Sequence, residues 1–335
     1  MRSLVLEATR RLAWHDVPEP VRRHEREAIV RPLAVATCDL DQPMIFGQTP
    51  FAMPVHLGHE CVAEVVEAPP GFAPGTRVVV PFQISCGCCE RCTRGLTGSC
   101  ATVAPLSMYG FGALGGDWGG MLSDLALVPY AEAMLVPLPE GLEPPVVASA
   151  ADNIADGWRA VAPALAEHSG ADVLVVGGIV RSVSLYAVDV ALALGAASVT
   201  YVDTDPGRCA VAQELGATVV EGEPGPSLGA FPVTVDGTAT PEGLVATLRR
   251  TDWGGRCTSL GQLAATGSLP LFDLYTRGVH LHIGRAMARP VIPAILALVA
   301  AGRLRPQLVT SATVGWDEAP QALLEPTVKL VVERP

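Results

Sequence analysis

The sequence predicts an α/β protein in which a β-rich part is followed by a doubly wound parallel sheet. Three observations predict this fold class. The chain has 335 residues, enough for two domains at about 150 residues each. Up to about residue 150, short β-branched runs alternate with Pro- and Gly-rich turns. From 151 to about 285, apolar strand-like runs alternate with helical patterns. We therefore expect domains at 1–150 and 151–285, with 286–335 as a C-terminal segment.

In the first part, three segments predict strands. They are "EAIVRPLAVATC" (27–38), "ECVAEVVEA" (60–68) and "GTRVVVPF" (75–82), which begins at Gly75. Each is rich in β-branched residues and is bounded by turn residues. The frequent Pro and Gly between them are typical of an all-β barrel with long loops.

In the second part, strands and helices alternate regularly. The segment "DVLVVGG" (172–178) is a fully apolar strand that ends in glycines, and "SLYAVDVALALGA" (184–196) is a helix closed by Gly195. Further strands are expected at 198–205, 233–238, 254–261 and 279–284, and further helices at 207–217 and 241–250. The helix expected at 290–304 and the strand at 329–333 need not belong to this sheet.

Charge and hydropathy exclude several functions. The formal net charge is −11, which disfavours a nucleic-acid partner because such proteins need a basic face. The first residues lack the apolar core of a signal peptide, and no apolar run reaches the roughly 20 residues of a membrane span. We expect a cytoplasmic protein without a membrane partner. In the cytoplasm thiols stay reduced, and clustered cysteines there more often bind a metal ion than form disulfides.

A glycine turn after the first strand of the second part predicts a nucleotide site. In a strand–turn–helix unit, backbone N–H groups and the positive helix end face a pyrophosphate. Here the turn reads "GGIVRSVS" (177–184), with Gly177 and Gly178 in place. The later glycine positions hold Ile179 or Arg181, and Ser182 or Ser184, depending on where a two-residue extension is placed, so the glycine signal alone is weak. Arg181 could contact a phosphate, although a solvated loop arginine is commoner.

Asp203, at the end of the next strand, strengthens the nucleotide prediction. An acidic residue there accepts hydrogen bonds from both ribose hydroxyls and repels a 2′-phosphate, which favours NAD over NADP. Alternatively, Asp203 is only a strand-end residue before the turn at 205–207.

Five cysteines within residues 86–100, "CGCCERCTRGLTGSC", predict a structural zinc site. Four of them form the series C-x-x-C-x-x-C-x₇-C, which supplies four thiolates from one small lobe. These four are Cys86, Cys89, Cys92 and Cys100. Cys88 breaks the register and is taken as a bystander. A redox C-x-x-C is the competing interpretation, but that motif needs two cysteines at a helix start.

A sparser set could form a catalytic metal site. It consists of Cys38, the sequence Gly58-His59-Glu60, and Asp152. Each residue alone is more often a core cysteine or a satisfied polar contact. Three protein ligands with one open position are what a catalytic zinc requires.

Together these motifs resemble the zinc-dependent medium-chain dehydrogenase/reductases, the alcohol dehydrogenase superfamily. The resemblance covers essentially the whole chain. It rests on Cys38 with Asp41, on "GHE" at 58–60, on the four-cysteine lobe, and on the glycine turn with Asp203. It implies a GroES-like β-barrel catalytic domain, completed by residues 286–335, and a Rossmann NAD-binding domain between them.

Carried over to this chain, the resemblance implies a role for each residue. Cys38 and His59 match two catalytic zinc ligands, and Asp152 falls where many members have the third, a cysteine. Glu60 matches a residue near the metal that can be a transient ligand, and Asp41 one that orients His59. Zinc would polarise the oxygen of an alcohol, aldehyde or ketone while NAD carries the hydride.

Two positions depart from the family pattern. The family usually has Ser or Thr two residues after the first cysteine, where its hydroxyl passes on the alcohol proton, and here that residue is Leu40. Many members have a histidine where this chain has Pro43. Water, Asp39 or a substrate group would have to replace this relay.

These departures leave alternatives open. One is an NAD(P)H-dependent reductase of an activated C=C, C=N or aldehyde group, which needs no alcohol relay. Another is a non-catalytic ligand-sensing or scaffold protein that keeps only the structural zinc. The resemblance also implies a homodimer or homotetramer, because the strand at 279–284 lies where family members pair across a dimer.

Overall fold

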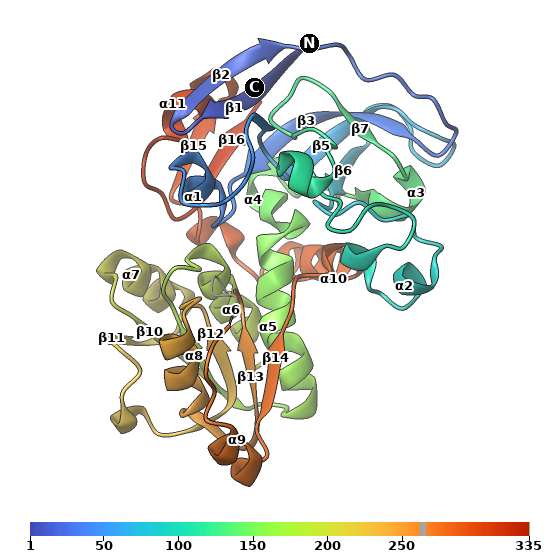
Figure 1. Cartoon of the computed structure of the whole chain (residues 1–335). Coiled ribbons are helices and arrows are strands. Elements are labelled where there is room, and N and C mark those ends of the chain that lie inside the picture. The colour runs from blue at the N-terminus through green and yellow to red at the C-terminus, as the bar shows by residue number, and fades with distance from the viewer. Residues whose placement is uncertain (262–265, 335) are drawn as a thin grey trace. The chain divides into compact units, whose positions relative to one another are not determined.

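The computed structural model describes residues 1–261 and 266–334. The chain divides into two compact units (Figure 1). Unit 1 comprises Met1–Ala155, Met287–Ala301 and Thr310–Pro335, and unit 2 comprises Asp156–Ala286 and Gly302–Val309. None of the helices in the described ranges has both the length and the hydropathy that a membrane span requires.

Unit 1 is built on two sheets. The larger has the order β15-β16-β3-β5-β6-β8, with β7 paired to β3. Its strands are β3 (Ala28–Ala36), β5 (Glu60–Glu67), β6 (Arg77–Val80), β7 (Ala126–Val128), β8 (Val136–Pro137), β15 (Ala312–Gly315) and β16 (Leu330–Glu333). The smaller sheet, of order β2-β1-β4, contains β1 (Arg2–Ala8), β2 (Arg11–Asp16) and β4 (Val55–His56). The C-terminal strand β16 therefore lies beside β3, far from it in sequence.

Short helices connect the strands of unit 1, and the longer α10 follows the return of the chain from unit 2. The α-helices are α1 (Asp41–Ile45), α2 (Glu90–Thr93), α3 (Ala131–Met134), α4 (Pro144–Val147), α10 (Ala288–Ala300) and α11 (Ala319–Ala322). The 3-10 turns are η1 (Thr97–Ser99), η2 (Gly112–Gly115), η3 (Ala148–Ala151) and η6 (Trp316–Glu318). Alternate residues of β3, β5 and β6 fill one apolar core, as expected for strands with one face buried.

Unit 2 is a six-stranded parallel sheet of order β11-β10-β9-β12-β13-β14. Its strands are β9 (Asp172–Val176), β10 (Ser198–Asp203), β11 (Thr218–Glu221), β12 (Phe231–Asp236), β13 (Thr251–Ser259) and β14 (His280–Ile283). Its helices are α5 (Asn153–Glu167), which begins in unit 1, α6 (Ser182–Ala193), α7 (Pro206–Leu215), α8 (Pro241–Leu248) and α9 (Leu271–Arg277), with 3-10 turns η4 (Pro226–Leu228) and η5 (Pro306–Leu308). From β9 the chain adds strands outward to β11, and it then returns to the other side of β9 and adds strands from β12 to β14. This reversal of direction beside β9 confirms the doubly wound sheet.

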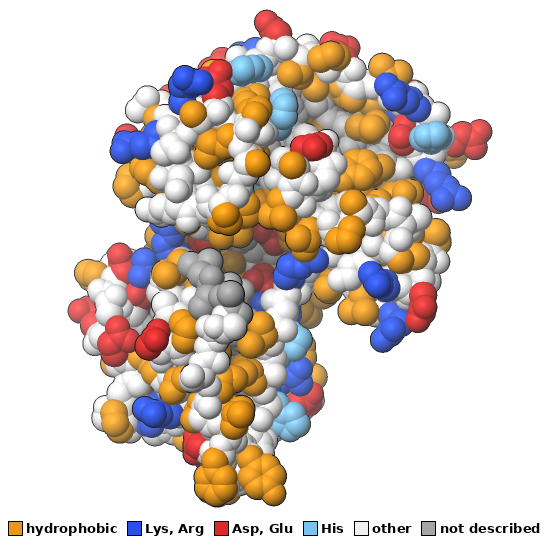
Figure 2. Space-filling view, in the orientation of Figure 1, with side chains coloured by type: hydrophobic (Ala, Val, Ile, Leu, Met, Phe, Trp, Pro, Cys, Tyr) orange, Lys and Arg blue, Asp and Glu red, His pale blue; other side chains and the backbone are white. Residues whose placement is uncertain are grey.

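Local chemistry explains where these helices begin and end. Asp205 caps α7 by accepting a hydrogen bond from the Arg208 N–H, Pro206 stands at its first turn, and Gly216 closes it with a left-handed backbone. Strand β9 is apolar throughout because both faces of a parallel sheet are covered. On the face drawn in Figure 2, acidic and basic side chains are interspersed among apolar ones in both units.

Several elements differ from the expectation, and strands β1 and β2 and helix α9 were not predicted at all. Helix α6 begins at Ser182 rather than at residue 184, because the turn after β9 is short and the helix starts immediately after Arg181. Strand β11 was not anticipated, because its four residues pair only with β10 at the edge of the sheet.

Candidate metal and cofactor sites

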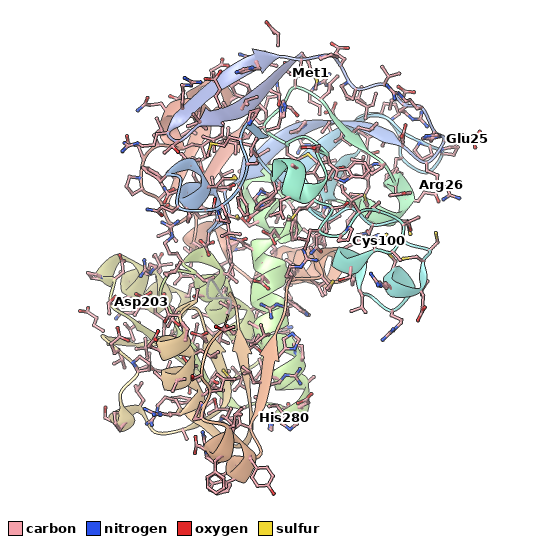
Figure 3. All side chains as sticks on the ribbon, in the orientation of Figure 1. Met1, Glu25, Arg26, Cys100, Asp203 and His280 are labelled. Carbon is pink, nitrogen blue, oxygen red and sulfur yellow. The ribbon has the colours of Figure 1, made fainter. Side chains whose placement is uncertain are left out.

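The sulfur atoms of Cys86, Cys89, Cys92 and Cys100 lie within 4.8 Å of one another. A tetrahedral zinc with Zn–S distances of about 2.3 Å places its sulfurs about 3.8 Å apart. The Cys89 and Cys100 sulfurs are 3.9 Å apart, which fits that geometry. All nine cysteines are free, so the lobe is not held by disulfides. Figure 3 labels Cys100 in this lobe.

The lobe also stabilises thiolates. The N–H of Cys89 and the hydroxyl of Thr102 donate hydrogen bonds to the Cys86 sulfur at 3.4 and 2.8 Å. Burial alone would raise the pKa of Cys86, but these donors lower it to about 5. Further N–H groups, from Cys92 and Ala101, face the Cys89 sulfur. The donor set therefore fits a structural zinc ion.

Cys88 is exposed, and its sulfur lies 3.7 Å from that of Cys86. It does not belong to the group of four sulfurs that could surround one ion. Its placement agrees with its interpretation as a bystander.

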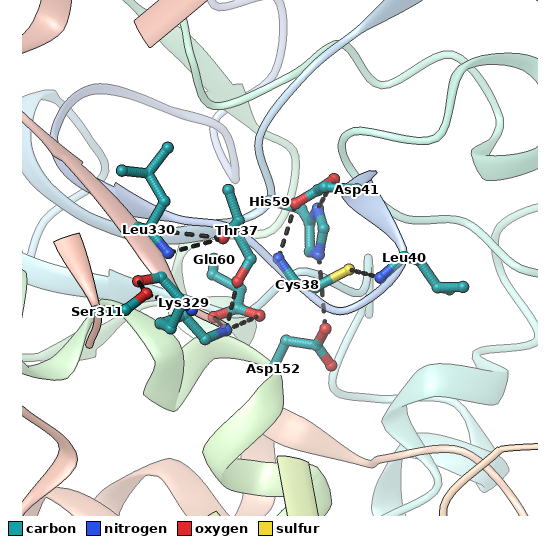
Figure 4. A network of polar contacts seen from close by, with 10 residues as sticks. All are labelled: Thr37, Cys38, Leu40, Asp41, His59, Glu60, Asp152, Ser311, Lys329 and Leu330. Atoms are coloured by element: carbon teal, nitrogen blue, oxygen red, sulfur yellow. Dashed lines mark hydrogen bonds and ion pairs between the residues drawn. The ribbon is translucent and has the colours of Figure 1, made fainter. Parts of the chain in front are cut away.

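Cys38 follows β3 in a loop that is fixed by hydrogen bonds (Figure 4). Its N–H donates to Asp41 at 2.7 Å, and its sulfur accepts from the N–H of Leu40 at 3.2 Å. Burial raises the pKa of the Cys38 thiol to about 12, so without a cation beside it this sulfur keeps its proton, and a bound metal ion would have to displace that proton.

His59 is fully buried between two carboxylates. Its Nε2 lies 3.5 Å from Asp152 Oδ2, and its Nδ1 lies 3.9 Å from Asp41 Oδ1. The preceding Gly58 has φ +91°, and a Cβ there would lie 2.7 Å from the Leu122 nitrogen, so this tight turn requires glycine. Burial alone would lower the pKa of His59, but the acidic groups around it raise that pKa well above its ordinary value.

The polar atoms of His59 fit a metal ion. Within the described residues, neither ring nitrogen has a hydrogen-bond partner, although both are buried. Buried polar atoms are normally satisfied, so a missing partner calls for an explanation. Two tetrahedral zinc ligands at about 2.0–2.1 Å from the ion lie about 3.4 Å apart, close to the 3.5 Å between His59 Nε2 and Asp152.

The predicted residues form two overlapping groups around His59. The first group consists of Cys38, Asp41 and His59, and the second of His59, Glu60 and Asp152. Within each group, the possible ligand atoms lie within 4.8 Å of one another. Cys38 and Asp152 do not fall into a single group of this kind. Asp41 reaches His59 only at 3.9 Å, so its firm contact is with the Cys38 backbone.

Lys329 also lies in this region, although it belongs to none of the sequence motifs. Its ammonium group meets Glu60 at 3.0 and 3.2 Å, and both side chains are fully buried (Figure 4). Burial raises the pKa of Glu60, and Lys329 opposes that rise. Lys329 is the only lysine in the chain, which was the one available signal.

Two phenylalanines form an apolar wall beside His59. The ring centroids of Phe111 and Phe82 lie 4.9 and 6.0 Å from that of the imidazole, and both phenylalanines are buried. Phe51 packs edge-on against Phe111, with centroids 5.7 Å apart. Tyr109 is part of the core, where its hydroxyl donates to the Leu127 carbonyl.

In unit 2, the glycine turn lies at the carboxyl end of β9. A Cβ on Gly177 would lie 2.1 Å from Asp203 Oδ2, so glycine is what allows this carboxylate to approach the turn. Gly178 has φ +155° and packs against the backbone of Thr238. Ser182 is fully buried at the first position of α6, whereas Arg181 just before it is partly exposed.

Asp203, labelled in Figure 3, ends β10. Its carboxylate accepts several hydrogen bonds. Arg208 donates to both of its oxygens, at 2.7 and 2.6 Å, and the Tyr201 hydroxyl donates at 2.6 Å. Burial alone would raise the pKa of Asp203, but Arg208 and Tyr201 lower it. Neither Arg208 nor Tyr201 belongs to a sequence motif, so neither contact could be predicted from the sequence.

Comparison with known proteins gives three kinds of similarity. Residues 24–140 match the family described as the alcohol dehydrogenase GroES-like domain. A probable zinc-binding alcohol dehydrogenase of Mycobacterium tuberculosis is 28% identical over 330 residues, which cover 95% of this chain and 83% of that protein. The glutathione-independent formaldehyde dehydrogenase of Pseudomonas aeruginosa is 33% identical over 210 residues, and the match spans 52% of its length.

Solved structures are similar over the whole chain. The alcohol dehydrogenase TADH from Thermus sp. ATN1 superimposes with a TM-score of 0.90 at 28% identity and 100% coverage of both chains. The structure of an NAD-dependent alcohol dehydrogenase superimposes with a TM-score of 0.82 at 25% identity, covering 99% of each chain.

Proposed function

This chain belongs to the zinc-type medium-chain dehydrogenase/reductase family, and we propose that it transfers hydride between NAD(H) and a small alcohol or carbonyl compound. It is an oxidoreductase with a GroES-like domain and a Rossmann-type parallel sheet. The main support for the proposal is His59, a buried imidazole that lies beside the Cys38 thiol and two carboxylates and whose nitrogens make no hydrogen bond within the described residues.

Cys38, His59 and Asp152 would hold the catalytic zinc, and the four-cysteine lobe would hold the structural one. When bound, zinc would act as a Lewis acid on the substrate oxygen and the nicotinamide would exchange the hydride. The apolar rings of Phe82 and Phe111 exclude water from one side of His59.

Alcohol oxidation also releases a proton, and Leu40 stands where the family resemblance implies a hydroxyl group that passes it on. For each hydride that leaves the alcohol carbon, the hydroxyl proton must reach solvent. Leu40 offers no hydroxyl group for this transfer, and its side chain is 38% exposed. Because Leu40 lies partly in solvent, we propose that water carries the proton past it.

The lack of a hydroxyl group at Leu40 also favours a second candidate function. An NAD(P)H-dependent reductase of an activated C=C, C=N or aldehyde group needs no relay from an alcohol. A preference for such substrates in the reductive direction, with no detectable alcohol oxidation, would identify this function.

For the cofactor we propose NAD. Asp203 ends β10 where a carboxylate can accept both ribose hydroxyls, and Gly177 leaves room beside it. Arg208 partly neutralises this carboxylate, so discrimination against NADP should be incomplete.

We further propose a homo-oligomer assembled through unit 2. Strand β14 is the last strand of its sheet, and His280 at its start is exposed (Figure 3). The neighbouring helix α9 exposes Phe272 by 80% and Tyr275 by 82%. In Figure 2, apolar side chains gather at this end of unit 2. Exposed aromatic groups beside an open strand edge are typical of an interface.

The test is a zinc analysis combined with a substrate panel. The proposal predicts about two zinc ions per chain and a change in NADH absorbance with one or more small alcohols, aldehydes or ketones. One zinc ion per chain and no absorbance change would favour a non-catalytic role.

A further inference from the structure

Lys329 is held in place by the backbone around it. It precedes β16, and its N–H donates to the Ser311 hydroxyl at 3.1 Å. The next residue, Leu330, exchanges hydrogen bonds with Thr37 at the end of β3. The C-terminal strand therefore carries a lysine to the interior of unit 1, next to the segment that contains Cys38.

The ammonium group of Lys329 is surrounded by oxygen atoms. It donates to both carboxylate oxygens of Glu60, at 3.2 and 3.0 Å, and to the carbonyl of Thr37. Lys329 and Glu60 are both 0% exposed. Burying an ion pair costs desolvation energy and adds little net stability, so this pair suggests a role other than stability.

The position of Glu60 indicates what that role is. Its carboxylate belongs to the group in which the donor atoms of His59, Glu60 and Asp152 lie within 4.8 Å of one another. A carboxylate so close could become a ligand of an ion held by the other two. A fourth protein ligand would fill the position that a catalytic zinc must leave open for substrate.

We propose that Lys329 is a positioning residue that restrains Glu60 and so keeps the fourth coordination position free. This inference rests on the proposed catalytic zinc. Both oxygens of Glu60 point to Lys329 rather than to His59 (Figure 4).

Charge balance supports the same role. A thiolate from Cys38 and a carboxylate from Asp152 neutralise a divalent ion. Glu60 would add a further negative charge as a ligand, which would weaken the attraction of the ion for a substrate oxygen. Paired with Lys329, Glu60 forms a neutral unit beside the metal instead.

The test measures access to the fourth position without any substrate. Imidazole binding to the zinc-loaded full-length protein is followed by calorimetry for the wild type, Lys329→Met and the double variant Lys329→Met/Glu60→Gln. If a released Glu60 occupies the position nine-tenths of the time, Lys329→Met binds imidazole about tenfold more weakly. The double variant lacks the competing carboxylate and should bind within about threefold of the wild type. Lys329→Arg, which keeps the charge, should restore much of the lost affinity.

The outcomes are distinguishable. Unchanged affinity in Lys329→Met, with zinc content equal to wild type, overturns this inference and leaves the proposed function intact. Equal weakening in the single and double variants also overturns it, because the effect then does not act through Glu60. If Lys329→Met does not fold, Glu60→Gln and the double variant must bind imidazole equally, and a difference overturns the inference. A wild type with one zinc ion per chain overturns both the inference and the proposed function.

Discussion

The guanidinium group of Arg208 donates hydrogen bonds to both carboxylate oxygens of Asp203, at 2.7 and 2.6 Å. This bidentate pair lies at the end of β10, next to the glycine turn that follows β9. A carboxylate alone would repel a 2′-phosphate, whereas a guanidinium beside it would attract one. The pair therefore predicts how cofactor preference responds to mutation.

Arg208→Ala should weaken NADP binding more than NAD binding, because the guanidinium is the group that can face a 2′-phosphate. Asp203→Ala should weaken NAD binding by about tenfold or more, because the ribose loses its acceptor. Dissociation constants for both cofactors, measured by titration with each variant, check this. An Arg208→Ala variant with an unchanged NADP-to-NAD ratio would show that Arg208 only orients Asp203.

Gly177→Ala should disrupt the cofactor site, because a Cβ at this position would lie 2.1 Å from Asp203 Oδ2 and 2.4 Å from the Tyr201 hydroxyl. Both groups must move, so NAD affinity should fall by about tenfold or more and the melting temperature should decrease. Gly225→Ala is the control, since a Cβ there would meet nothing closer than 3.9 Å. Equal NAD affinity in the two variants would contradict the assignment of this turn.

Cys92→Ser should remove the structural zinc, because it takes one of the four sulfurs from the lobe. We expect the loss of about one zinc ion per chain and a lower melting temperature. The control is Cys88→Ser, which changes an exposed cysteine outside the four and should keep the full zinc content. Zinc loss from Cys88→Ser, with retention in Cys92→Ser, would reverse the assignment.

Asp189 should make the stability of the protein depend on pH. It is buried in α6, where its Oδ2 accepts a hydrogen bond from the Arg305 N–H at 2.7 Å, and burial raises its pKa to about 6. The folded state therefore favours the protonated form. The protonated Asp189 side chain therefore adds to the free energy of unfolding. This added stability is fully present below the unfolded pKa of about 3.9 and is lost as the pH rises through about 6.

The comparison with Asp189→Asn isolates this effect, because asparagine does not titrate. Between about pH 4.5 and 7.5, the stability of the wild type relative to the variant should fall by about 2 kcal/mol. Urea unfolding of both proteins at the two pH values checks it. A difference that stays constant or grows with pH would contradict the raised pKa.

The parts of the molecule that the sequence predicted are those encoded by local spacing. The four-cysteine lobe lies within fifteen residues, and the strand, turn and helix around Gly177 are continuous. The parallel sheet could be predicted because buried strands such as β9 are apolar throughout. The family resemblance then supplied the GroES-like domain.

The parts that could not be predicted depend on contacts between distant segments. Glu60 and Lys329 meet because β16 pairs with β3, and no sequence pattern specifies that pairing. Phe82 and Phe111 come from separate loops and reach His59 only in the folded chain. Arg208 is near Asp203 in sequence, but the sequence does not show that their side chains meet. They meet because Arg208 lies in the first turn of α7, from which its guanidinium group reaches the Asp203 carboxylate.

The proposed catalytic zinc is tested most directly by NADH-coupled turnover of Cys38→Ser compared with wild type, on whichever substrate the panel identifies. If Cys38 holds this zinc, Cys38→Ser should lose at least about a thousandfold in rate, since the ion would supply several kcal/mol of stabilisation to the transition state. Cys61→Ser makes the same change at another buried cysteine of unit 1 and should retain turnover. A Cys38→Ser variant that turns over within a few-fold of wild type would contradict the zinc mechanism.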